Sequence, residues 1–215
     1  MKKTFLVILC LVFSATASAE DWISLFDGKT LSGWNSWKTK SALVEGAWKA
    51  EEGSLSLTGK GGGDIYTAEA FENYEFEAEW KTTGNSGILL RVDPSSTGAI
   101  WHRAPEMQVD KGNPDALKST SAGGLYALYD FTEKKVFDPN GWNMVKIRCE
   151  NHRFQIWFNG KKAHDFTVGS EDWKSRVAKS KFRKYPGFGE TKLGHIGFQD
   201  HGARVQYRNI RIRKL

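Results

Sequence analysis

Apolar and polar residues alternate along much of this chain. Residues 74–80 read Tyr-Glu-Phe-Glu-Ala-Glu-Trp, which places Glu75, Glu77 and Glu79 on one face of a strand and apolar side chains on the other. Residues 106–110, Glu-Met-Gln-Val-Asp, alternate in the same way. Because alternation with a period of two is typical of half-buried strands, both segments are predicted to pack one face into a core.

Short runs of this kind recur along most of the sequence. Further strands are predicted at 47–50, 54–57, 87–92, 124–129, 142–149, 153–158, 162–167, 194–198 and 205–213. Asn159-Gly160 is a strong signal for a two-residue hairpin turn. Only residues 170–182 favour a helix, because Ser170 can cap it and two acidic residues follow in its first turn.

Many short strands without long intervening helices predict an all-β fold of two stacked antiparallel sheets. No internal repeat is apparent, which disfavours a propeller or a solenoid. Trp34, Trp48 and Trp80 are expected in the core. The loops 60–63 and 93–104 are expected to be mobile and to lie near a binding face.

The N-terminal residues predict an export signal. Two lysines precede an apolar stretch at 5–13, which is too short to span a bilayer, and Ala-Ser-Ala at 17–19 matches a cleavage site. Residues 1–19 are therefore expected to be a signal peptide cleaved after Ala19, and residues 20–215 a single domain. The expected location is periplasmic or secreted, in a bacterium, with no membrane span.

Cysteine content and charge add two constraints. Cleavage would leave Cys149 without an intramolecular disulfide partner, which is ordinary for a bacterial periplasmic protein. Lys and Arg number 31 against 25 Asp and Glu, a mild net charge of +6. A mild excess on an exported chain gives no reason to expect a nucleic-acid partner, and solvated surface accounts for it.

Two polar strand faces are candidates for a site. Glu106, Gln108 and Asp110 form a row that could bind sugar hydroxyls, a metal ion or a proton, although a solvent-facing edge strand would show the same pattern. The three glutamates at 75–79 would repel one another unless cations neutralise them. Arg91, on the following predicted strand, is the expected partner of Glu79, either as an ordinary ion pair or as part of a cleft.

Several segments together resemble the 3-keto-disaccharide hydrolase family. They are Ser-Leu-Phe-Asp-Gly-Lys-Thr-Leu-Ser-Gly-Trp at 24–34, Asn-Ser-Gly-Ile-Leu-Leu-Arg at 85–91, the Glu-x-Gln strand at 106–110, the hairpin at 142–160, Gly-Phe-Gln-Asp-His-Gly at 197–202 and Tyr-Arg-Asn-Ile-Arg-Ile at 207–212. The resemblance spans nearly the whole mature chain and implies a concanavalin-like jelly roll. It also implies a carbohydrate partner, a glycoside oxidised to a ketone at C3. A polar insertion at 129–135 departs from the family pattern and leaves substrate choice open.

The implied substrate has a distinctive chemistry. A C3 ketone acidifies the C2 hydrogen, so a base can generate an enolate, the C1 substituent can leave, and water can add back. This requires a base, a positive charge or donors for the enolate oxygen, and an acid for the leaving group. A direct hydrolase would instead need two carboxylates at a set separation. The pattern of a retaining β-glucanase is incomplete, because Glu106 and Asp110 are four residues apart.

Three residues are predicted to be catalytic. Glu106 would act as base or metal ligand, His201 as an acid–base group, and Arg91 as the charge that stabilises the enolate. The predicted substrate-binding residues are Glu79, Gln108, Asp110, Trp157, Trp101, Tyr126, Gln199 and Asp200. His102 could approach the substrate from a rim.

Each assignment has a structural alternative. Glu106 could merely orient a sugar, His201 could be an ordinary turn residue, and Asp110 could cap a turn. Trp157 would stack on sugar only if its face of the sheet forms the cleft. A divalent metal, calcium or a transition metal, stays open because the ligand types are present without a recognised metal-binding motif. A non-catalytic carbohydrate-binding module is the alternative function.

Overall fold

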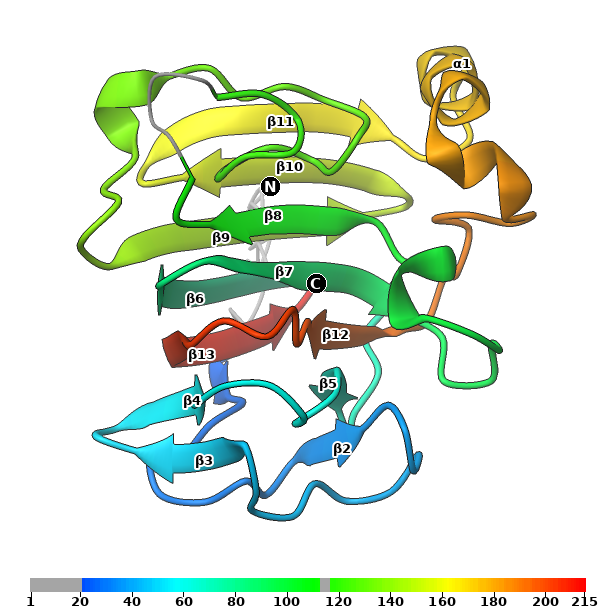
Figure 1. The fold of residues 1–215 in the computed structure, drawn as a ribbon. Coiled ribbons are helices and arrows are strands. Elements are labelled where there is room, and N and C mark those ends of the chain that lie inside the picture. The colour runs from blue at the N-terminus through cyan, green and yellow to red at the C-terminus, as the bar shows by residue number, and fades with distance from the viewer. Residues whose placement is uncertain (1–20, 113–116) are drawn as a thin grey trace, which may run out of the picture.

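The computed structural model describes residues 21–112 and 117–215 and shows two antiparallel sheets stacked face to face (Figure 1). The strands are β1 (Ile23–Ser24), β2 (Trp34–Ser36), β3 (Trp48–Glu51), β4 (Ser54–Leu57), β5 (Ile65–Thr67), β6 (Tyr74–Thr82), β7 (Asn85–Val92), β8 (Glu106–Asp110), β9 (Asn143–Glu150), β10 (Arg153–Phe158), β11 (Lys161–Thr167), β12 (His195–Phe198) and β13 (Val205–Lys214). The helices are α1 (Glu171–Lys179) and the 3-10 turns η1 (Ile100–His102), η3 (Lys134–Val136) and η4 (Lys181–Lys184).

One sheet has the order β11-β10-β9-β6-β13-β4-β3, with β1 added beside β13, and the other has the order β2-β5-β12-β7-β8. Neighbours in sequence often lie in different sheets, as in a jelly roll. The all-β, two-sheet prediction is confirmed. None of the helices in the described part of the chain is long and apolar enough to cross a membrane.

Buried aromatic side chains fill the space between the sheets. Trp34, Trp48 and Trp80 are each 1% exposed, so their prediction as core residues is confirmed. Trp34 stacks on Phe198 with ring centroids 4.8 Å apart, and Phe198 stacks on Tyr207 at 3.8 Å. These stacks join the inner faces of the two sheets and fix the distance between them.

The predicted strand at 124–129 was wrong. The segment does run beside β8, since Gln108 N donates to Gly124 O and Tyr126 N donates to Glu106 O. It then turns back at once, because Ala127 adopts a positive φ of 57° and Tyr129 N bonds to Leu125 O. The turn covers the outer edge of β8, which is therefore not a solvent-facing edge strand.

The predicted helix is present, with one interruption. Ser170 caps α1 by accepting a hydrogen bond from Trp173 N at 3.2 Å, as expected. Ser180 ends the helix and caps the next turn in the same way, with Phe182 N donating to its Oγ at 3.0 Å. Lys181 is thereby the first residue of η4, at a position that the site below depends on.

The glutamates of β6 are neutralised on the outer face of the eight-stranded sheet, but not by Arg91. Glu79 binds Arg208 at 2.7 Å and Asn209 at 2.7 Å. Arg91 is 1% exposed and binds Glu72 O at 2.9 Å. The expected Glu79–Arg91 pair was wrong because β6 and β7 belong to different sheets: the turn between them crosses the sandwich.

Candidate active site

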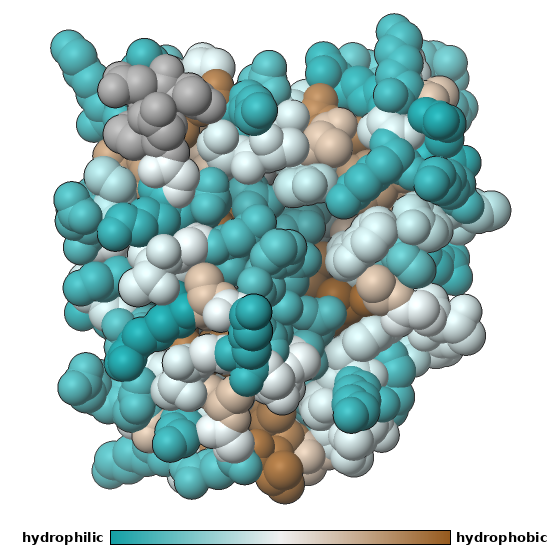
Figure 2. Space-filling model, viewed as in Figure 1, coloured by the Kyte–Doolittle hydropathy of each residue, from teal (hydrophilic) through white to brown (hydrophobic). Residues whose placement is uncertain are grey.

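A polar hollow of about 150 Å³ lies on the outer face of the five-stranded sheet. Its lining residues come from three strands or their ends and from three connecting segments: Asn85, Trp101, Glu106, Tyr126, Lys181, Gln199 and His201. We call it the Glu106 hollow. Figure 2 views this face of the molecule, and hydrophilic side chains gather over its centre.

Strand alternation and one glycine place the Glu106 carboxyl. Met107 and Val109 are fully buried in the core, so Glu106 and Gln108 project from the outer face of β8. Gly87 lies on the neighbouring strand, and a Cβ there would overlap the Glu106 carboxyl. The carboxyl therefore lies over the backbone of β7, in space that only a glycine leaves free.

Burial makes Glu106 an unusual acid. It is 5% exposed, and among the described residues nothing donates a hydrogen bond to its carboxyl. Loss of hydration raises its pKa to about 8; the Lys181 charge opposes this rise and the Asp64 charge adds to it. Glu106 is consequently mostly protonated at neutral pH and can donate a proton.

Lys181 supplies a positive charge to the Glu106 hollow. Its Nζ lies 4.3 Å from the ring centroid of Trp101 and 4.2 Å from that of Tyr126, a cation–π arrangement. Burial lowers its pKa, against the attraction of Glu106. The sequence reasoning missed this residue; the only signal was its place at the end of the predicted helix.

The end of β12 forms the other side of the hollow. Gln199 is fixed by its backbone, because its N donates to Gly87 O at 3.0 Å and its O accepts from Ser86 Oγ at 2.7 Å. His201 follows in the next turn and lines the hollow. Asp200 points to backbone instead, accepting from Gly63 N and Gly202 N, each at 2.8 Å, and so closes the turn that presents His201.

Gln108 and Asp110, the other two polar residues of β8, lie beside the Glu106 hollow and do not line it. Gln108 is fully buried and its Nε2 donates to Asn85 Oδ1 at 2.9 Å, so it positions a lining residue. Its Oε1 has no hydrogen-bond partner among residues 21–112 and 117–215. Asp110 accepts from the backbone of Gly112 and Lys111, as expected for a turn cap, and burial raises its pKa while the nearby His201 charge lowers it.

Gln108, Asp110 and Asp200 lie beside the Glu106 hollow without lining it, and three further predicted site residues lie away from it altogether. Arg91 lies buried against His152, with Nη1 3.2 Å from His152 Nδ1. Glu79 lies on the other sheet, and so does Trp157, which lines a separate hollow with Met144 and Lys146. Sequence alternation gives the face of a strand but not the sheet to which the strand belongs, and this is why Glu79 and Trp157 were included. Arg91 does belong to the sheet of the hollow, but its positive φ of 53° breaks the regular strand conformation, and its guanidinium bonds to Glu72 O and His152 instead.

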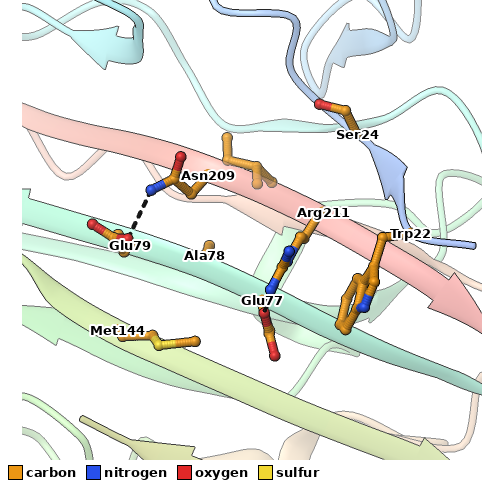
Figure 3. Close-up of a pocket in the computed structure, with 9 residues that line it drawn as sticks. Trp22, Ser24, Glu77, Ala78, Glu79, Met144, Asn209 and Arg211 are labelled. Atoms are coloured by element: carbon orange, nitrogen blue, oxygen red, sulfur yellow. Dashed lines mark hydrogen bonds and ion pairs between the residues drawn. The ribbon is translucent and has the colours of Figure 1, made fainter.

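A larger hollow of about 470 Å³ lies on the outer face of the eight-stranded sheet (Figure 3). Its carboxylates already have cationic partners: Arg211 donates to Glu77 and Arg208 to Glu79. Burial raises the pKa of Glu79, but bonds from Asn209 and Arg208 outweigh it and hold the pKa below its usual range. No group described there is poised to move a proton, so the smaller hollow is the candidate active site.

A metal ion finds no evident ligand set in the described residues. Among them, no group of three or more His, Cys, Asp or Glu side chains could hold one. The possible divalent metal stays a prediction from the sequence.

Together these features define a concanavalin-like jelly roll with a buried acid, a cation and an imidazole around one hollow on its smaller sheet. The chain belongs to the family of 3-keto-alpha-glucoside-1,2-lyase-like domains, whose sequence profile matches residues 21–213. It is 30% identical to a 3-keto-disaccharide hydrolase of Bacteroides thetaiotaomicron, over 92% of this chain and 79% of that protein. The resemblance inferred from the sequence motifs is thus confirmed.

Solved structures give the same fold. A candidate glycosyl hydrolase from Parabacteroides distasonis is 29% identical, with a TM-score of 0.80 over 90% of this chain and 94% of its own. The carbohydrate-binding module CBM66 from Bacillus subtilis is 15% identical, with a TM-score of 0.55 over 86% of this chain and 98% of its own. At that identity the second likeness shows the fold alone.

Proposed function

We propose that this protein cleaves 3-keto-glycosides at the C1 glycosidic bond, by elimination followed by hydration. One observation carries the proposal: the buried, largely protonated Glu106 shares a hollow with the Lys181 ammonium and the His201 imidazole. These supply the acid, the positive charge and the base that elimination next to a ketone requires. The family and the Bacteroides relative, named for 3-keto substrates, support the same chemistry.

The first step removes the proton at C2. His201, in its neutral form, takes this proton, and the electrons of the C–H bond move to the C3 oxygen to form an enolate. Lys181 stabilises the new negative charge, which is the role that the sequence had suggested for Arg91. The aromatic rings of Trp101 and Tyr126 hold the Lys181 ammonium at the hollow.

The second step expels the aglycone. The enolate electrons form the C1–C2 double bond, the C1–O bond breaks, and Glu106 gives its proton to the departing oxygen. In an α-glucoside the C2 hydrogen and the C1 oxygen lie on opposite faces of the ring, so acid and base must be different groups. Glu106 on β8 and His201 after β12 meet this need, because β7 lies between their strands.

Hydration reverses these roles. The Glu106 carboxylate takes a proton from water as the water oxygen attacks C1, and the His201 imidazolium, after its N–H has exchanged with solvent, delivers a proton to C2. The products are the free 3-keto-sugar and the aglycone alcohol, and both catalytic groups regain their starting protonation states. No oxidant or reductant is consumed.

The test is turnover of a 3-keto-α-glucoside with a chromogenic aglycone in deuterated water. Elimination predicts aglycone release together with deuterium at C2 of the product, whereas direct hydrolysis would leave hydrogen there. Glu106→Gln should lose at least 100-fold in kcat, as expected for removal of a general acid. Glu75→Gln, a matched change of a buried glutamate on the other sheet, should retain activity.

Two results would reject the proposal. One is the absence of aglycone release by the unaltered protein. The other is sugar binding that survives in Glu106→Gln and His201→Ala without any turnover to lose, as a non-catalytic carbohydrate-binding module would show. Release without deuterium at C2 would keep the glycosidase and replace elimination by direct hydrolysis.

We further propose that residues 20–215 act as one exported domain after removal of the signal peptide at 1–19, which lies outside the described residues. N-terminal sequencing of the protein recovered from the periplasm or the medium tests this. Recovery of the full-length chain from the cytoplasm alone would refute it.

A further inference from the structure

Asp64 lies at one end of a row of residues whose other end the Glu106 carboxyl covers. It comes one residue before Ile65, which pairs with Phe198 across β5 and β12, so Asp64 is next to Gln199 on the outer face. Gln199 bonds to Gly87, and the Glu106 carboxyl lies over Gly87. Asp64, Gln199 and Gly87 thus form a row across three strands. The Glu106 carboxyl of the fourth strand, β8, reaches over the end of this row because Gly87 has no side chain.

Hydrogen bonds between carboxylates and backbone amides join the Asp64 segment to the turn that presents His201. Asp64 Oδ1 accepts from Asp200 N at 2.9 Å, while Gly63 N donates to the Asp200 carboxylate at 2.8 Å. The Asp64 carbonyl also accepts from Trp37 N at 2.8 Å. The two segments therefore clamp each other through reciprocal side-chain bonds to backbone amides.

The charges around Glu106 come from several elements. Lys181 faces it from η4 and attracts its charged form, whereas Asp64 repels that form. The Tyr207 hydroxyl lies on the core side, bonded to Ser86 Oγ at 2.9 Å. On the far side of the hollow, the His201 charge acts on Asp64 itself. Among these groups, Asp64 is the carboxylate whose charge opposes ionisation of Glu106.

We propose that Asp64 is a positioning residue of this site, which anchors the His201 turn through Asp200 and places a negative charge on the same face of the sheet as Glu106. Its catalytic meaning rests on the proposed function. Burial raises the pKa of Asp64 to about 6, with the Asp200 charge adding to this and a bond from Asp200 N opposing it. At neutral pH, Asp64, which has the lower pKa, is then mostly ionised, whereas Glu106, which has the higher pKa, is mostly protonated.

Asp64→Asn separates the two roles, because an asparagine Oδ1 can still accept from Asp200 N but carries no charge. A carbon-13 NMR titration of the Glu106 carboxyl, assigned with Glu106→Gln, should show its pKa lowered by about half a unit in Asp64→Asn. Asp165→Asn, which alters an exposed ion pair with Arg153 on the other sheet, is the matched control and should cause no change.

Asp64→Ala removes the acceptor as well. The amide of Asp200 should then exchange with solvent at least tenfold faster than in the unaltered protein, while Asp64→Asn keeps its protection. With a 3-keto-glucoside as substrate, Asp64→Asn should move the alkaline limb of kcat/KM down by the same half unit. Asp64→Ala should in addition lose about tenfold in kcat.

Identical Glu106 titrations in the unaltered protein and Asp64→Asn would overturn the charge role, and unchanged Asp200 exchange in Asp64→Ala would overturn the anchoring role. Neither measurement needs substrate, so both decide the matter even if the proposed function fails. If Asp64→Asn does not fold, the unaltered protein still provides the test. The Glu106 signal should then show a small early step near pH 6 as Asp64 ionises, and a single-step curve would refute the coupling.

Discussion

Replacing Glu106 by Gln should stabilise the protein at alkaline pH and leave its stability nearly unchanged at acidic pH. The folded state holds the Glu106 pKa at about 8 because of burial, against an ordinary value of 4.5. Between these values the folded state keeps a proton that the unfolded state has lost. The contribution of Glu106 to the free energy of unfolding therefore falls as the pH rises from about 4.5 to about 8.

The magnitude follows from the same two values. One unit of pKa difference corresponds to about 1.4 kcal/mol, so the free energy of unfolding lost above pH 8 amounts to about 3 to 5 kcal/mol. Glutamine is nearly isosteric with the protonated acid and cannot ionise, so Glu106→Gln should recover this amount. Most single substitutions in a protein interior destabilise instead, which makes the expected sign distinctive.

Urea unfolding of both proteins at pH 4.5, 6.5 and 8.5, followed by tryptophan fluorescence, measures this difference. Glu75→Gln is the matched control, because the pKa of Glu75 is shifted in the opposite direction. Burial raises it, but hydrogen bonds from Arg148 and Arg213 outweigh burial and hold it below its usual value. The stability lost in Glu75→Gln should be largest above 4.5, the ordinary pKa of a glutamate, and should shrink as the pH falls. Equal effects of Glu106→Gln at all three pH values would show that Glu106 is ionised in the folded protein and refute the reasoning.

Four further results are expected from the same structure. The pH profile of kcat/KM for a 3-keto-glucoside should fall tenfold per unit above about pH 8, as the Glu106 proton donor is lost; a rise through pH 8 would make Glu106 the base instead. Gly87→Ala should cut kcat by about 100-fold, because the new Cβ displaces the Glu106 carboxyl, and unchanged kinetics would contradict this geometry. Lys181→Met should lower kcat by about 100-fold or more and raise the Glu106 pKa seen by NMR, and an unmoved pKa would exclude their electrostatic coupling. Trp157→Ala, on the other sheet, should leave kcat/KM within about twofold, and a larger loss would place substrate on that face.

The alternation of polar and apolar residues along single strands gave much of the correct prediction. It placed Glu106 and Gln108 on the outer face of β8 and Met107 and Val109 in the core, as the structure shows. The capping serine at 170 and the core tryptophans were also evident from the sequence. In each case the determining interaction is local or depends only on the polarity of the side chain.

Residues at strand ends and in loops were harder to predict. Lys181 reaches the Glu106 hollow because Ser180 breaks the helix and η4 packs against Trp101 and Tyr126. Asp64 joins the site only through the pairing of β5 with β12, which are far apart in sequence. Such placement depends on which strands become neighbours, and this information is not contained in any one segment.

The contrast between β6 and β8 shows how register decides function. Both strands carry acidic residues on one alternating polar face. Glu75 lies opposite Arg148 on one side and Arg213 on the other, so its charge is neutralised on formation of the sheet.

Glu106 instead lies opposite Leu89, with its carboxyl over Gly87, and no cation stands across from it in the ladder. The positive charge that acts on Glu106 comes from Lys181, which belongs to a separate turn and lines the same hollow. Introducing an arginine at Leu89, as Leu89→Arg, should therefore convert Glu106 into an ordinary ion-paired carboxylate, lower its pKa below 4.5 and abolish proton donation, at some cost in stability. Retained activity at neutral pH in a folded Leu89→Arg protein would show that the register around Glu106 does not set its role.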